Sequence, residues 1–289
     1  HWSTPHCINR LTARCRFCNS VKKLSNKKSK KLFMSKLGTL YLVPNTLGDD
    51  GRTDQLPWVL PAETIAQSAK LKHWIVEDAK TARALLKAID SVSPLACTIQ
   101  EMQMSEWRGA ARNAKYGDSV KPADLLKPLL AGNDMGLMSE AGVPGVADPG
   151  AELVLAAHKL GAQVKPLVGP SSILLGLMAS GLNGQRFAFQ GYLPHDTHER
   201  TAKLKQLEIE SRKLQQTQIW IETPYRNTAM LMACINSLAP QSLLCLGVDL
   251  SLPSEMITTL SIADWRKRYP NEAACASLQN RPTVFLLLA

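Results

Sequence analysis

The sequence predicts an α/β protein with two α/β domains, mostly parallel sheets and a cleft between the domains. Short apolar runs alternate with longer segments of helical periodicity along most of the 289 residues. Strands that alternate with helices in this way form parallel sheets covered on both faces. A Gly-Leu-Asn-Gly break at residues 181–184 divides the pattern. We therefore expect an N-terminal domain at residues 34–184 and a C-terminal domain at residues 185–289.

The predicted strands of the N-terminal domain are short apolar runs. They lie at residues 38–44, 73–76, 95–99, 135–138 and 163–168. The segments between them carry apolar residues at helical spacing, and we expect helices at residues 61–70, 81–89, 122–131 and 151–160, with a further helix after residue 172 that runs through Met178.

The C-terminal domain repeats this pattern less regularly. Its predicted strands lie at residues 187–193, 217–221, 243–248, 256–260 and 283–288. Helices are expected at residues 199–214, which are charged and amphipathic, and at residues 230–238. No short sequence repeat joins the two halves.

The composition is that of a soluble globular protein, with 45% hydrophobic and 20% charged residues. No run approaches the ~18 apolar residues of a membrane helix, and the first residues lack a secretory pattern. Four of the seven cysteines lie in apolar segments without regular spacing, as buried thiols do in a reducing compartment. These features predict a cytoplasmic protein that does not bind a membrane.

The positive charge is concentrated at the N-terminus. Of a net charge of +10, residues 1–33 supply nine basic residues and no acid, which leaves 25 basic and 24 acidic residues from Met34 onward. The overall basicity therefore does not argue that the folded part binds nucleic acid. We expect residues 1–33 to be a disordered arm or a stretch upstream of the natural start at Met34. Cys15 and Cys18 have the spacing of half a zinc site, but no second pair accompanies them, so no metal is predicted.

The most informative segment is residues 139–150, SEAGVPGVADPG. It follows an apolar strand and precedes a helix, and its three glycines allow backbone atoms to approach a ligand closely. Asp148 followed by Pro149 fits a helix N-cap and first turn. In an open α/β sheet this position lies at the carboxyl edge, where ligands bind. An ordinary strand-to-helix connection would have the same pattern.

Five strand-end segments together resemble the tetrapyrrole methylase superfamily of S-adenosylmethionine-dependent methyltransferases. They are residues 40–44 (LYLVP), 77–80 (EDAK), 139–150, 169–172 (GPSS) and 222–226 (ETPYR). Within the superfamily, the chain is most similar to the ribosomal RNA small-subunit 2′-O-ribose (cytidine) methyltransferase branch. That branch carries Ser-Asp-Ala-Gly-Thr-Pro-Gly-x-x-Asp-Pro-Gly where this chain has residues 139–150. The resemblance extends from about Gly38 to the end of the chain, in a short form without the extra C-terminal domain of the longer RNA enzymes.

The resemblance implies that S-adenosylmethionine lies between the two domains of an enzyme that is usually a homodimer and acts on ribosomal RNA. The residues that it implies for cofactor binding are Pro44, Gly48, Ser139, Glu140, Ala141, Gly142, Pro144, Gly145, Asp148, Gly169, Pro170, Ser171 and Ser172. This cofactor has no phosphate, so neutral amides and hydroxyls suit it better than a basic clamp. No G-x-G-x-x-G fingerprint is expected, and none occurs.

Transfer of a methyl group to a sugar hydroxyl needs a base that removes the hydroxyl proton. Glu77, Asp78 and Glu222 are our catalytic candidates because each stands at a strand end. Each could instead cap a helix or form a surface salt bridge. Tyr225 and Arg226 are candidates for substrate binding by stacking and charge pairing, or they could cap a helix.

Several substitutions reduce the resemblance on the substrate side. Lys80 stands in place of an arginine, and Glu140 replaces an aspartate. Residues 248–252 (VDLSL) replace Arg-Glu-Leu-Thr-Lys, and residues 195–199 (HDTHE) replace a lysine- and arginine-rich loop. The loss of cations weakens phosphate binding, on which RNA affinity depends. Two alternatives therefore stay open: methylation of a tetrapyrrole or other small molecule, and a cofactor-binding paralogue without catalysis.

Overall fold

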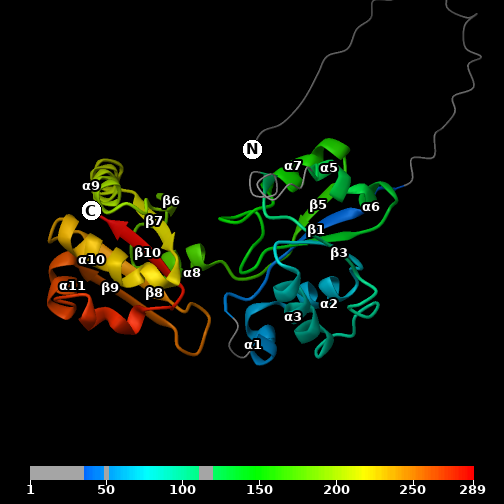
Figure 1. Ribbon diagram of the computed structural model, residues 1–289, viewed down its shortest axis with the longest axis horizontal. Coiled ribbons are helices and arrows are strands. Elements are labelled where there is room, and N and C mark those ends of the chain that lie inside the picture. The colour runs from blue at the N-terminus through cyan, green and yellow to red at the C-terminus, as the bar shows by residue number, and fades with distance from the viewer. Residues whose placement is uncertain (1–35, 49–51, 111–119) are drawn as a thin grey trace, which may run out of the picture. The chain divides into compact units, whose positions relative to one another are not determined.

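The computed structural model describes residues 36–48, 52–110 and 120–289 (Figure 1). The predicted arm at residues 1–33, with Cys15 and Cys18, lies outside the described residues. Two sheets account for the strands of the described part, one formed by strands before residue 167 and the other by strands after residue 186.

The first sheet is entirely parallel, as the alternation of strands and helices predicted. Its order is β3-β2-β4-β1-β5, and all four pairings are parallel. Alternate side chains of a strand point to opposite faces, so Tyr41 and Val43 enter one core while Leu40 and Leu42 enter another. The strands are β1 (Thr39–Val43), β2 (His73–Val76), β3 (Gln103–Glu106), β4 (Met135–Met138) and β5 (Gln163–Pro166).

Helices cover both faces of this sheet. Buried residues of the first three helices, among them Leu56, Ile65 and Leu85, pack with Tyr41 and Val43. On the opposite face, helices that precede and follow β4 pack with Leu40 and Ile75. Each fully buried leucine contributes ~1.5–3 kcal/mol of hydrophobic stabilisation. The helices are α1 (Arg52–Val59), α2 (Ala62–Ala69) and α3 (Ala79–Asp90) on the first face, and α5 (Pro122–Leu125), α6 (Lys127–Leu130) and α7 (Ala151–Leu160) on the second.

The topology creates a crevice between β1 and β4, which are neighbours in the sheet. The chain leaves β1 across one face toward β2, and it leaves β4 across the other face toward β5 on the far side of β1. The loops after the two strands therefore separate at their carboxyl ends, where ligands bind in open parallel sheets. Residues 139–150 lie at this edge, as predicted.

Two local predictions in this half were wrong. Residues 95–99 form no strand; they are an irregular segment whose Leu95, Cys97 and Ile99 pack against the core that contains α3. The strand is instead the polar segment β3, which is at the edge of the sheet and needs no apolar side chains. The helix expected at residues 122–131 is two short helices, since Pro128 lacks the N–H that a continuous helix requires.

The second sheet is mixed, with order β6-β7-β10-β8-β9. Only β6 and β7 are parallel, and the three other pairings are antiparallel. The expectation of a mostly parallel sheet was therefore wrong for this half. The connection between β8 and β9 is too short for a crossover helix, which forces an antiparallel pair. The strands are β6 (Phe187–Tyr192), β7 (Thr217–Glu222), β8 (Leu243–Val248), β9 (Met256–Ser261) and β10 (Thr283–Leu288).

The central strand β10 joins two cores in this sheet. Phe285 and Leu287 face one core, where Phe285 stacks on Trp220 with ring centroids 5.7 Å apart. Val284 and Leu286 face the other, which α8 covers. The helices are α8 (Ser172–Ser180) on that face, α9 (Thr197–Leu214), α10 (Asn227–Ser237) and α11 (Ile262–Arg268) on the opposite face, and the 3₁₀ turns η1 (Pro224–Arg226) and η2 (Ala273–Leu278).

Helix α8 follows the first sheet in sequence but packs against strands of the second. It thus brings the residues after β5 to the second sheet. The domain boundary at residues 184 and 185 stays a prediction. In the described part of the chain, no helix has the length and apolar character needed to cross a bilayer.

Candidate functional site

A cavity of about 250 Å³ lies where the strand-end loops of the first sheet meet the second sheet. The first sheet contributes Leu47, residues from the loop after β4, and the first residues of α8. The second sheet contributes residues from the ends of β6, β7, β8 and β10. Apolar side chains such as Ile173, Ile221 and Leu250 form much of the lining, with hydroxyls at Ser171 and Ser172.

The loops after β1 and β4 are held together by a buried asparagine. The Asn45 side-chain amide donates to the carbonyl oxygens of Glu140, at 2.9 Å, and Ser139, at 3.3 Å. Its backbone N–H donates to the Gly142 carbonyl at 2.8 Å. Asn45 is fully buried, and a buried polar group of this kind is costly unless its hydrogen bonds are made. These contacts fix the shape of the cavity on the first-sheet side.

The loop after β4 uses backbone conformations that favour glycine. Gly142 has φ +68° and lines the cavity, with its missing Cβ position 3.2 Å from the Leu47 side chain. Gly150 has φ +140° and is the N-cap of α7. The prediction that Asp148 caps this helix was therefore wrong. The left-handed turn at Ala147, with φ +66°, places Asp148 in the wall of the cavity instead.

The electrostatic character of the cavity comes from carboxylates. Asp148 and Glu222 line it, and no lysine or arginine is among its lining residues in the described part of the chain. Burial, together with the charges of Glu77 and Glu140, raises the pKa of Asp148 to about 7, while a hydrogen bond from the Ser139 side chain opposes the rise. Such a lining suits a cationic ligand and disfavours a phosphate.

Glu222, at the end of β7, is buried and held by several donors. The backbone N–H of Thr223 donates to it at 2.7 Å and the Thr223 hydroxyl at 3.1 Å. Its second oxygen forms an ion pair with Arg226, one helical turn later. Burial raises the pKa of Glu222, and the Thr223 hydrogen bonds oppose that rise. Arg226 is thereby fixed beside the cavity rather than within its lining.

Tyr192, at the end of β6, belongs to the cavity although the sequence analysis gave it no role. Its side chain is 57% exposed. Burial of part of the ring raises the pKa of its hydroxyl, as do the charges of Asp148, Glu222 and Glu77. The tyrosine therefore lies close to the acids of both sheets. The only sequence signal was its place at the end of a predicted strand.

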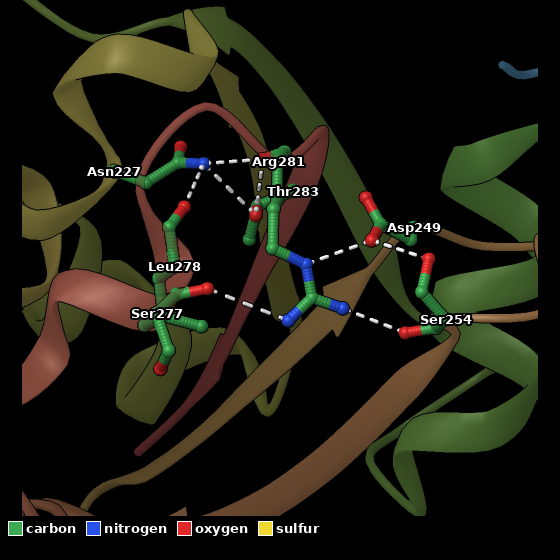
Figure 2. Close-up of polar contacts among 7 residues, drawn as sticks. All are labelled: Asn227, Asp249, Ser254, Ser277, Leu278, Arg281 and Thr283. Carbon is green, nitrogen blue, oxygen red and sulfur yellow. Dashed lines mark hydrogen bonds and ion pairs between the residues drawn. The ribbon is translucent and has the colours of Figure 1, made fainter. Parts of the chain in front are cut away.

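The second-sheet wall of the cavity is braced by a polar network (Figure 2). Arg281 Nε donates to Asp249 Oδ2 at 2.7 Å, and its Nη2 donates to the Ser254 carbonyl at 2.6 Å. The Asn227 amide, at the start of α10, donates to the carbonyls of Leu278 and Arg281 and to the Thr283 hydroxyl. The network ties together the loops that carry Leu250 and residues 282–284 into the cavity.

The structure brings some of the predicted site residues together and leaves others outside the lining. Ala141, Gly142, Asp148, Ser171, Ser172 and Glu222 line the cavity. Asp78 instead caps α3, where it accepts from the Thr81 N–H at 2.9 Å and pairs with Arg108. Glu77 accepts from the Glu140 N–H at 3.2 Å. The predicted residues outside the lining are Pro44, Gly48, Ser139, Glu140, Pro144, Gly145, Gly169, Pro170, Glu77, Asp78, Tyr225 and Arg226.

Some of these residues support the cavity from behind. A Cβ on Gly169 would lie 2.2 Å from Pro44 Cγ, so the loops after β1 and β5 can pack this closely only with glycine there. The loop after β1 also packs tightly against the loop after β8. A Cβ on Gly48 would lie only 2.7 Å from a Leu252 methyl carbon, so glycine allows this close approach. Tyr225 is 59% exposed and is available to a partner.

Comparison with known proteins identifies the class of fold. A cobalamin biosynthetic enzyme, cobalt precorrin-4 methyltransferase, matches with a TM-score of 0.51 at 12% sequence identity, over 86% of this chain and 94% of that one. The fold is thus that of the tetrapyrrole methyltransferases, as the strand-end motifs predicted. No family model matches the sequence.

In sequence, the chain is similar to proteins named ribosomal RNA small subunit methyltransferase I. The Vibrio cholerae protein of that name is 32% identical over 149 residues, which cover 52% of this chain and 50% of that protein. The Xylella fastidiosa protein is 31% identical over 206 residues, which cover 71% of this chain and 64% of that protein. The chain therefore spans about half the length of the Vibrio relative and less than two thirds of the Xylella one.

Proposed function

We propose that this protein is an S-adenosylmethionine-dependent methyltransferase that methylates a ribose 2′-hydroxyl of ribosomal RNA. The observation that carries the proposal is the composition of the cavity: backbone-rich loops, two serine hydroxyls and two carboxylates, without a cationic side chain among its lining residues. S-adenosylmethionine has a positively charged sulfonium and no phosphate, so this lining suits it and does not suit a nucleotide phosphate. Its relatives named as ribosomal RNA methyltransferases support the acceptor.

The cofactor supplies an electrophilic methyl group, and the protein supplies alignment. Ala141, Gly142, Ser171 and Ser172 would hold it through amides and hydroxyls, since all four line the cavity. Alignment of reacting groups contributes up to roughly 7–11 kcal/mol in intramolecular reactions. Removal of the hydroxyl proton calls for a carboxylate at the cavity, and two line it: Glu222, the candidate predicted from the sequence, and Asp148.

On the substrate side, exposed Tyr225 would stack on an RNA base and Arg226 would approach a phosphate. We also propose that the protein is a cytoplasmic homodimer, from the resemblance stated above. The domain organisation proposed is an N-terminal unit at residues 34–184 and a C-terminal unit at residues 185–289.

The proposal is tested with the full chain, tritium-labelled S-adenosylmethionine and ribosomal RNA from cells that lack the protein. Alkali cleaves RNA through the 2′-hydroxyl, so a 2′-O-methyl group protects the next phosphodiester bond. We expect the label in alkali-stable dinucleotides. Label in mononucleotides would show that the methyl group is on a base and would contradict the proposal. Transfer to a tetrapyrrole but not to RNA would favour a small acceptor, and cofactor binding without any transfer would favour a non-catalytic paralogue.

A further inference from the structure

Of the two carboxylates that line this cavity, Asp148 has fewer protein partners, with one hydrogen bond from the Ser139 side chain. The oxygens of Glu222 are engaged by Thr223 and Arg226, and Asp78 caps a helix away from the lining. Asp148 lines the cavity, is half-buried, and forms no ion pair within the described part of the chain. A carboxylate in this position is available to a reacting group.

Burial is the main feature that disfavours the charged form of Asp148, and two carboxylates add to it: Glu77, which follows β2, and Glu140, in the same loop. A hydrogen bond from the Ser139 side chain acts in the opposite direction. Tyr192, at the end of β6, is close enough to feel the charges of both Asp148 and Glu222. Two cations act on Glu222, which pairs with Arg226 and whose pKa Arg200 lowers. Among the described residues Asp148 forms no ion pair that would offset its burial and its two carboxylate neighbours, in keeping with its pKa of about 7.

We propose that Asp148 accepts the proton of the acceptor hydroxyl, and that it becomes fully ionised only when the cationic methyl donor shares the cavity. The proposal rests on the function proposed above. In the reaction the O–H bond of the acceptor breaks and its proton passes to the Asp148 carboxylate, while its electron pair forms the new bond from oxygen to the methyl carbon. The bond from carbon to sulfur breaks, and its electron pair stays on sulfur as a neutral thioether.

This assignment keeps the charge of the cavity constant through the reaction. Before transfer, the sulfonium contributes +1 and Asp148 contributes −1; afterward both groups are neutral. A cavity that already contains Glu222 and lies beside Glu77 and Glu140 would otherwise become one charge more negative when sulfur loses its charge. S-adenosylhomocysteine has no charge on its sulfur, so its binding does not lower the pKa of Asp148.

The test is calorimetric titration of the full chain at pH 7 in buffers of different ionisation enthalpy, which counts the protons released on binding. An adjacent positive charge lowers a carboxyl pKa by roughly 1–3 units, so we expect S-adenosylmethionine to release about 0.4–0.5 proton from Asp148. The Asp148 contribution should raise the affinity for S-adenosylmethionine roughly five- to tenfold between pH 6 and pH 8. S-adenosylhomocysteine should show neither effect.

Asp148→Asn identifies the protons that come from Asp148. Any proton that the ligand itself releases is released with wild type and variant alike, so it cancels in the difference between them. The difference in proton release between wild type and Asp148→Asn should vanish for S-adenosylhomocysteine, and the exposed control Asp54→Asn should behave as wild type. Equal proton release by wild type and Asp148→Asn with S-adenosylmethionine would overturn the inference. Failure of wild type to bind either ligand would instead contradict the proposed function.

Discussion

Arg281 and Asp249 join two loops through an ion pair in which Nε lies 2.7 Å from Oδ2. Asp249 precedes Leu250, and Arg281 precedes Pro282 and Thr283, all of which line the cavity. The Asp249 side chain is only 8% exposed, whereas that of Arg281 is 26% exposed. The pair therefore fixes the second-sheet wall of the site from behind, with Ser254 and Asn227 as further supports (Figure 2).

Arg281→Ala should destabilise the protein because it leaves the buried Asp249 carboxylate without its partner. We expect a loss of about 3–5 kcal/mol in the free energy of unfolding, since removal of one member of a buried pair is strongly unfavourable. Urea denaturation measures it. Lys267→Ala is the control, because the Lys267–Asp264 pair is exposed and such pairs contribute ~0–1 kcal/mol. Equal losses in the two variants would show that the Arg281 network does not brace the wall.

Gly142→Ala should weaken cofactor binding as well as stability. A Cβ at φ +68° costs about 1–2 kcal/mol, and here it would also press on the Leu47 side chain inside the cavity. Gly161→Ala is a matched control, since Gly161 has φ +76° but nothing within 4 Å of its Cβ position. We expect similar losses of thermal stability in both variants and a lower affinity for S-adenosylmethionine only in Gly142→Ala. Unchanged affinity in Gly142→Ala would remove this loop from the binding site.

The folded protein without ligand should lose stability from about pH 4 to pH 7 through Asp148. The pKa of this group is raised to about 7 in the folded state, whereas it is ~3.9 in an unfolded chain. The folded state therefore binds more protons in this interval, and the free energy of unfolding falls as pH rises. Asp148→Asn removes the dependence, so the variant should be more stable than wild type at pH 8 and nearly equal to it at pH 4. Denaturation curves at both pH values measure the difference, which should be absent if Asp148 is not shielded from water.

Tyr225→Ala should impair RNA methylation with little effect on stability. Its ring is 59% exposed, and loss of one base-stacking contact costs about 1–3 kcal/mol of binding free energy. We expect the KM for RNA to rise by roughly 5–150-fold while the affinity for S-adenosylmethionine is retained. Leu155→Ala, at an equally exposed apolar residue of α7, should leave the KM unchanged. A normal KM for Tyr225→Ala would exclude Tyr225 from RNA binding.

The sequence predicts the fold best where a strand is buried and therefore apolar. β2, β4, β8 and β10 begin and end at the predicted residues, because each is an apolar run bounded by turns. β3 was missed since an edge strand with one partner needs no apolar pattern. The antiparallel pairings of the second sheet were also missed. The β8–β9 pair follows from a short connection, which was overlooked as a sign of antiparallel pairing. The two pairs of β10 depend on where that strand enters the sheet, which is a long-range property that no local pattern encodes.

For the site, the sequence predicts the segments at the strand ends but not how their side chains are arranged. The resemblance named Gly142, Ser171 and Ser172, which line the cavity, and also Gly145 and Gly169, which do not. Asp148 was predicted both as a cofactor-binding residue and as an N-cap. The N-cap prediction failed because the left-handed turn at Ala147 places Asp148 in the wall of the cavity. Tyr192 was missed because it reaches the acids of the other sheet only through the tertiary fold.

The central claim is that the cation-free cavity holds S-adenosylmethionine, and equilibrium dialysis of the full chain with the tritiated cofactor tests it most directly. We predict saturable binding at one site per chain that excess S-adenosylhomocysteine displaces and excess ATP does not, because no lysine or arginine lines the described cavity to receive a phosphate. Absence of saturable binding, or equal displacement by ATP, would contradict the account.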